Sequence, residues 1–318
     1  MKRQILLPLL LGAALILACL LSSCGGTDKP FSPAGESVSP SLSESSLSDS
    51  PSGPASGSAD GGSEPAESSP AGEEPASGSE GLEYKEIGGE LYVAGLGECK
   101  DKDVVIPASV GGKPVREIDD GAFRGKDVLS VVIPRGVVRI GESAFEDCAS
   151  LQSVTLPADM HGISEDAFSG CVSLQEISLP AMDYVGSSAF SGCTSLRTVT
   201  IGGAPMFDSR VFSGCVSLKT AVFTGNAGSL GKSIFDGCSS LQEVTLPKTL
   251  EEISPSAFSG CVNLESIRIP SSVVSVGSFA FGGTHLKTVE YEGTKEDWEK
   301  ISVSAGNDQL TGAEIRFS

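Results

Sequence analysis

The chain has 318 residues and a formal net charge of −19, from 41 acidic and 22 basic side chains. A chain this acidic is repelled by nucleic acid and by anionic membrane surfaces, so its charge argues against nucleic-acid binding. Apolar residues dominate positions 1–24, are almost absent from 25–81 and return in 82–318. We therefore expect the folded part of the chain to lie in residues 82–318.

The first 24 residues have the features of an export signal. Lys2 and Arg3 supply positive charge, and residues 5–21 form an apolar stretch. The stretch ends in LSSC at Cys24, which resembles a bacterial lipobox, where small residues precede a cysteine that receives lipid. Cys19 is a weaker alternative because a bulky leucine lies two positions before it, and an uncleaved anchor is a further alternative. Lipid on Cys24 would anchor the protein to a membrane without spanning it.

Residues 25–81 have the composition of a tether. Ser, Pro, Gly, Ala, Glu and Asp dominate, and Phe31 is the only aromatic residue. Such a segment cannot bury enough apolar surface to offset its chain entropy, so we expect disorder. As a flexible coil it would span roughly 40 Å. Whether its many hydroxyl groups carry glycans is left open.

A phrase of the type SAFSGCVNLESI, from Ser256, recurs through the rest of the chain. Its phenylalanine lies at positions 123, 145, 168, 190, 212, 235, 258 and 281, in steps of 22 or 23 residues. A period in the low twenties predicts a solenoid of stacked coils. Equivalent phenylalanines should then form one continuous buried spine.

Each repeat contains a short strand pattern, as in LQSVTLP, LQEISLP and LESIRIP. Period-two alternation places Ile267 and Ile269 on one face of a strand and Arg268 on the other. Most of these strands end at a proline, and the few residues before the phenylalanine are too short for a full helix. We expect a parallel sheet on one side of the coil and a single short turn on the other.

Different patterns mark the two ends of the repeat region, which we place at 104–290. Residues 82–103 alternate apolar and polar side chains around Gly88 and Gly89, which predicts a capping hairpin.

The C-terminal stretch 291–318 is predicted to be a helix-strand cap. Thr294 and Asp297 have the spacing of a helix N-cap box, and Trp298 and Ile301 lie three apart on one helical face. The sequence GAEIRF then supplies a closing strand. The predicted fold class is accordingly an α/β repeat.

The repeat resembles the BspA-like (treponemal-type) leucine-rich repeats. The phrases that carry the resemblance are IPRGVVRIGESAFEDC (133–148), LPKTLEEISPSAFSGC (246–261) and, as far as its phenylalanine, IPSSVVSVGSFAFGG (269–283). The resemblance implies a right-handed solenoid with a concave parallel sheet and short convex turns. It also implies a surface-exposed or secreted protein that binds host proteins or other cells, without catalytic residues in the repeat.

Two repeats depart from the pattern. Residues 202–212 and 224–235 lack the proline that ends the strand elsewhere. We expect their loops to bulge and to be a candidate contact site.

The repeat cysteines admit three interpretations. They lie at Cys148, Cys171, Cys193, Cys215, Cys238 and Cys261. No C-x-x-C-like pair is present, so metal is not expected. Disulfides are possible in an exported protein, but parallel side chains in adjacent coils have the wrong geometry. We expect small buried residues. Cys99 lies outside this register.

Outward positions of the predicted sheet are the candidate ligand-binding residues. The resemblance places them on the concave face, where small hydroxyl side chains predominate and aromatic residues are missing. A protein ligand is therefore expected before a glycan, although Ser and Thr are also ordinary solvent-facing strand residues. The candidates are Ser153, Thr155, Glu176, Ser178, Thr198, Thr200, Thr220, Val222, Glu243, Thr245, Ser266 and Arg268.

The sequence offers little for catalysis. Its two histidines, His161 and His285, are many repeats apart, and the tetrad from Ser229 to Lys232 lacks the companion motifs of serine acyl enzymes. We expect no enzyme activity and no cofactor. The predicted function is a lipid-anchored cell-surface binding or adhesion protein for host or neighbouring cells. The alternative is a structural or glycan-capturing envelope lipoprotein.

Overall fold

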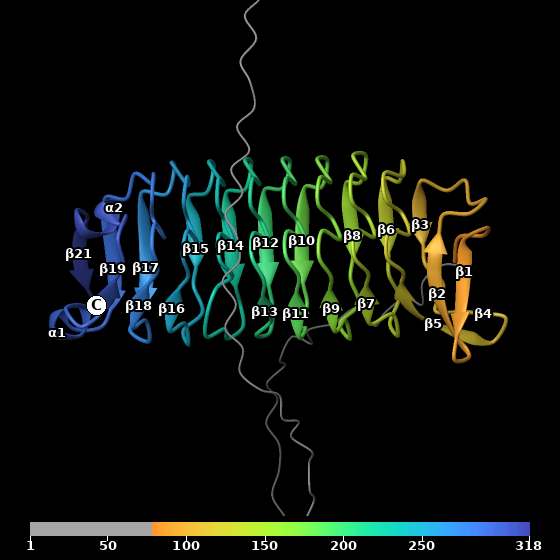
Figure 1. Ribbon diagram of the computed structural model, residues 1–318, viewed down its shortest axis with the longest axis horizontal. Helices are drawn as coiled ribbons and strands as arrows, with labels where there is room; N and C mark the ends of the chain where they lie inside the picture. The colour runs from red at the N-terminus through yellow and green to blue at the C-terminus, as the bar shows by residue number, and fades with distance from the viewer. Residues whose placement is uncertain (1–77) are drawn as a thin grey trace, which may run out of the picture. The chain divides into compact units, whose positions relative to one another are not determined.

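The structure is a computed structural model, and it describes residues 78–318. The predicted export signal, the lipid site at Cys24 and the predicted tether up to residue 77 lie outside the described residues. In the described part, successive coils stack along one axis and each contributes short strands (Figure 1). Within residues 78–318, no helix has the length and apolar character needed to cross a membrane.

One set of strands lies side by side and parallel, and we call it the main sheet. Its strands form three hydrogen-bonded segments, which are β3-β6-β8, β10-β12-β14-β15 and β17-β19-β21. Alternate side chains point into the core, as with Ile177 and Leu179 of β10. The strands are β3 (Asp103–Val105), β6 (Ser130–Val132), β8 (Ser153–Thr155), β10 (Glu176–Leu179), β12 (Thr198–Ile201), β14 (Thr220–Phe223), β15 (Glu243–Thr245), β17 (Ser266–Pro270), β19 (Thr288–Glu292) and β21 (Glu314–Phe317).

A second parallel ladder runs along the return side of the coils. Each coil has the expected short turn around its phenylalanine, as at residues 142–147, but the sequence analysis missed the short strand that precedes it. The α/β class is wrong, because the fold is nearly all strand. Most of these strands have two residues, too few for periodicity to reveal, but each coil places them in the same position. They are β2 (Glu90–Gly95), β5 (Lys113–Ile118), β7 (Arg139–Ile140), β9 (Gly162–Ile163), β11 (Tyr184–Val185) and β13 (Met206–Phe207), then β16 (Glu252–Ile253), β18 (Ser275–Val276) and β20 (Ser302–Val303).

The N-terminal end is a hairpin of β1 (Glu83–Ile87) and β2, which pair antiparallel. Gly88 and Gly89 both have positive φ, which a tight turn requires and which glycine adopts without steric cost. Strand β2 then pairs parallel with β5, so the hairpin continues the second ladder. A two-residue strand, β4 (Ser109–Val110), pairs antiparallel with β5.

The C-terminal unit differs from the predicted helix-strand cap. Thr294 accepts a hydrogen bond from the Asp297 amide, but helix α1 (Lys295–Trp298) is a single turn and ends before Ile301. A second helix, α2 (Asp308–Thr311), is equally short. Strand β21 pairs with β19 and closes the main sheet (Figure 1).

Asn307, which the sequence analysis missed, ends the stack of coils. In regular coils the phenylalanine N–H donates to the next coil, as Phe258 does to the Ala280 carbonyl at 2.8 Å. The last one, Phe281, donates instead to Asn307 Oδ1 at 3.1 Å. Asn307 Nδ2 donates in turn to the carbonyl oxygens of Gly277 and Ser304. One buried amide thus takes the place of the missing next coil.

The predicted phenylalanine spine is confirmed. All eight rings are fully buried, and consecutive rings stack with centroids 4.9–5.7 Å apart and interplanar angles of 2–18°. Burial of each is worth about 1.5–3 kcal/mol relative to exposure. The spine therefore holds neighbouring coils in register.

The repeat cysteines are buried and free, as expected, and none of the described cysteines forms a disulfide. Each Sγ donates to the phenylalanine carbonyl of the preceding coil, as Cys148 does to Phe123 at 2.9 Å and Cys193 to Phe168 at 3.3 Å. A thiol is small enough for this corner and gives the carbonyl a second donor, in addition to a backbone N–H of the carbonyl's own coil, such as Lys126 N–H for Phe123.

Candidate binding face

The outward side chains of the main sheet form rows across neighbouring coils. Glu176, Thr198, Thr220 and Glu243 are aligned by the parallel register of β10, β12, β14 and β15. Ser178, Thr200, Val222 and Thr245 form a parallel row two residues further along these strands. All twelve candidate residues are exposed or half-buried. Whether this face binds a ligand stays a prediction.

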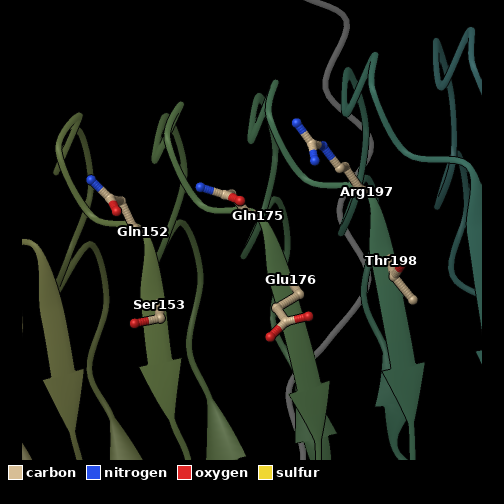
Figure 2. Close-up of a pocket in the computed structure, with 6 residues that line it drawn as sticks. All are labelled: Gln152, Ser153, Gln175, Glu176, Arg197 and Thr198. Atoms are coloured by element: carbon tan, nitrogen blue, oxygen red, sulfur yellow. The ribbon is translucent and has the colours of Figure 1, made fainter.

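A shallow hollow of about 410 Å³ lies where β8, β10 and β12 begin (Figure 2). Its lining combines three predicted residues, Ser153, Glu176 and Thr198, with three that the sequence analysis missed, Gln152, Gln175 and Arg197. A second hollow of about 310 Å³ continues down the same strands past Ser178 and Thr200. The two hollows make one polar trough across three coils.

The missed residues had a recognisable position in the repeat. Gln152, Gln175 and Arg197 each directly follow the repeat leucine and precede the first strand residue. In Figure 2 they form an upper row, with Ser153, Glu176 and Thr198 below them on the strands. The sequence analysis considered only outward positions within the strands, so it passed over the residue at the strand entrance.

Charge in this trough is not neutralised by ion pairs. Among the described residues, neither Arg197 nor Glu176 has an ion-pair partner within 4.0 Å. Further along the face, Arg268 pairs with Glu290 at 2.5 Å, and Lys287 with Glu265 at 2.7 Å. The exposed Arg197 guanidinium, beside the Gln175 amide, can bind a carboxylate with two hydrogen bonds, while Glu176 can bind a cation.

In the part of the chain that the structure describes, the other candidate residues do not assemble into a site. His161 Nδ1 lies 3.9 Å from a carboxylate oxygen of Asp183, and both side chains are more than two-thirds exposed. Ser229 borders a hollow whose lining includes neither Lys232 nor a histidine. Across residues 78–318, no group of three His, Cys, Asp or Glu side chains is arranged to hold a metal ion.

The two repeats that lack the strand-ending proline interrupt the second ladder. Strand β13 is the last of its sheet, and the ladder resumes only at β16, preceded by an isolated bridge between Ser229 and Glu252. A hollow of about 640 Å³ lies between residues 204–208 and 227–229 at this interruption. The predicted irregularity is therefore present on the return side of the coil.

Comparison with solved structures supports the same architecture. A leucine-rich repeat protein of T. pallidum is 28% identical, with a TM-score of 0.51, over 61% of this chain and 91% of that chain. A leucine-rich repeat protein from Bacteroides ovatus is 25% identical, with a TM-score of 0.51, over 74% of this chain and 70% of that chain. The comparison with curated proteins gave no match.

The family model for the BspA type leucine-rich repeat region matches in six copies, over residues 116–239 and 206–305. These spans include most of the main sheet and all eight phenylalanines of the spine. Such solenoids are typically non-catalytic protein-interaction folds, and members of this type are typically surface-exposed bacterial proteins. The chain thus belongs to the BspA-type leucine-rich repeat family.

Proposed function

We propose that the chain is a non-enzymatic, lipid-anchored surface protein that uses the outer face of the main sheet to bind proteins of host or neighbouring cells. The observation that carries this proposal is the polar trough, where Arg197 and Glu176 have no ion-pair partner. Elsewhere on the face, charges such as Arg268 are already paired. Unpaired charges of both signs on a rigid sheet are available to complement a partner.

The proposed location rests on the N-terminal sequence. LSSC ending at Cys24 fits a lipid attachment site, and the polar segment 25–81 would hold the solenoid away from the membrane. The surface exposure that is typical of the family supports the same arrangement.

Display of the full chain on a bacterial surface tests the proposal. We expect specific, saturable binding to a host matrix or cell-surface protein, or to a protein of a neighbouring bacterium. Arg197→Ser should weaken this binding at least tenfold, since a charged hydrogen bond is worth about 1.5–3 kcal/mol.

Arg210→Ser is the matched control. Arg210 is also exposed, but it lies in the turn between β13 and Phe212, and several repeats have serine at that position with the same positive φ. It should leave binding unchanged. Absence of any saturable protein partner would refute the proposal. Selective binding on a glycan array, or an envelope defect without loss of adhesion, would instead favour the glycan-capturing or structural alternative.

A further inference from the structure

The interruption of the second ladder is bounded on both sides by close contacts between coils. A Cβ atom at Gly225 would overlap the Gly203 carbonyl oxygen, and one at Gly231 would overlap that of Asp208. Between these two contacts, a Cβ atom at Gly228 would meet nothing within 4 Å. The two coils therefore touch at residues 203 and 208 and separate in between.

This separation leaves backbone groups of β13 without the partners that they have elsewhere. On one side the ladder is intact, because Met206 N–H donates to the Asp183 carbonyl at 2.9 Å. On the other side, the described residues provide no hydrogen-bond donor for the carbonyl oxygens of Pro205 and Phe207. Unpaired strand carbonyls are acceptors available to an incoming chain.

The hollow between the coils has an apolar side chain at its edge and carboxylates around it. Met206 is 74% exposed, and Phe207 is half-buried beside it. Asp208, Glu251 and Glu252 also line the hollow. All three carboxylates are exposed, and none has an ion-pair partner among residues 78–318. An exposed methionine among unpaired carboxylates favours a ligand that is both apolar and cationic.

We propose that this hollow is a docking site for an arginine or lysine side chain presented by an extended segment of a protein partner. The aliphatic stem of such a side chain packs against Met206 and Phe207, while its cation meets the carboxylates of Glu251 and Glu252. The backbone N–H groups of the docked segment also find acceptors in the Pro205 and Phe207 carbonyl oxygens. The site lies outside the main sheet and does not depend on the function proposed for that sheet.

Direct binding of a labelled peptide to the full chain tests this inference. The probe is a fluorescent octapeptide in which arginine alternates with leucine, and its matched partner has glutamine in place of arginine. We expect saturable binding of the arginine peptide alone. The double variant Glu251→Gln, Glu252→Gln should weaken it at least tenfold, and Met206→Ser should also weaken it.

The control variant is Glu142→Gln, Glu165→Gln, which makes the same change in net charge at two exposed carboxylates that line neither the trough nor the hollow. It should bind the arginine peptide like the unaltered protein, and Arg197→Ser should do the same. Equal loss of binding in both double variants would mean that the peptide is attracted only by the overall negative charge of the protein. Equal binding of the arginine and glutamine peptides would show that the cation has no role. Either result would overturn the docking site, and neither depends on a ligand for the main sheet. Thermal melts of each variant verify that it is folded.

Discussion

At the scale of single residues, the repeat phrase specifies packing rather than recognition. Its phenylalanine forms the stacked spine, and its cysteine donates to the carbonyl of the phenylalanine one coil earlier. At the C-terminal end, Thr284 occupies the cysteine position and donates to the carbonyl of Phe281 in its own coil at 2.8 Å. The Phe258 carbonyl, one coil earlier, accepts only the Cys261 N–H among the described residues, so the side-chain hydrogen bond between coils is not made at this end of the stack.

Buried thiols are expected to make the solenoid less stable at alkaline pH. Burial raises the pKa of Cys148 from its ordinary value of 9.0 to about 11. Since the folded-state pKa is the higher one, its contribution is complete below pH 9 and is lost as the pH rises from 9 through about 11. We expect the denaturation midpoint in urea to fall over this range.

The variant Cys148→Ala identifies this contribution. Tyrosines also titrate at alkaline pH, so the informative quantity is the difference between the two proteins. The midpoint of the variant should fall less steeply between pH 9 and 11 than that of the unaltered chain. Identical slopes would show that Cys148 does not contribute.

At the scale of elements, the two ladders differ in how the sequence encodes them. Main-sheet strands have up to five residues with clear alternation, as in β17 and β19. Most return strands have only two residues, such as β9 and β11, so no periodicity exists to be detected. They become a ladder because the coils have nearly the same length, 22 or 23 residues, and most coils place these strands in register.

The C-terminal closure depends on one amide, and Asn307→Ala should destabilise it. Asn307 is 3% exposed, and its removal leaves the Phe281 N–H buried without an acceptor. We expect a loss of about 1–3 kcal/mol in the free energy of unfolding, measured in urea. Asn263→Ala is the control, because Asn263 is exposed and its amide makes one bond, to the Ser239 carbonyl. A loss of equal size in both variants would contradict the closing role of Asn307.

At the scale of the whole molecule, the solenoid offers two separate polar surfaces. One is the trough of the main sheet around Arg197, and the other is the hollow beside Met206 on the return side. At the trough, neighbouring coils are joined by both ladders and by the spine. At the hollow the second ladder is interrupted, and the main sheet and the spine alone hold the coils in register.

The proposed lipid anchor at Cys24 gives a further prediction. In cells grown with a labelled fatty acid, Cys24→Ala should abolish lipid labelling and release the protein from the membrane fraction. Cys19→Ala should leave both unchanged. The opposite pattern would place the lipid on Cys19 instead of Cys24.

The sequence by itself determined the repeat, the spine and the strands of the main sheet. These depend on side chains such as Phe190 and Ile267, whose identity recurs every 22 or 23 residues and whose burial requires stacked coils. Only the tertiary structure showed the second ladder, the closure by Asn307 and the gathering of Gln175 and Arg197 beside Glu176. Each of these depends on which residues of different coils come to lie next to one another, and a pattern within one coil contains no such information.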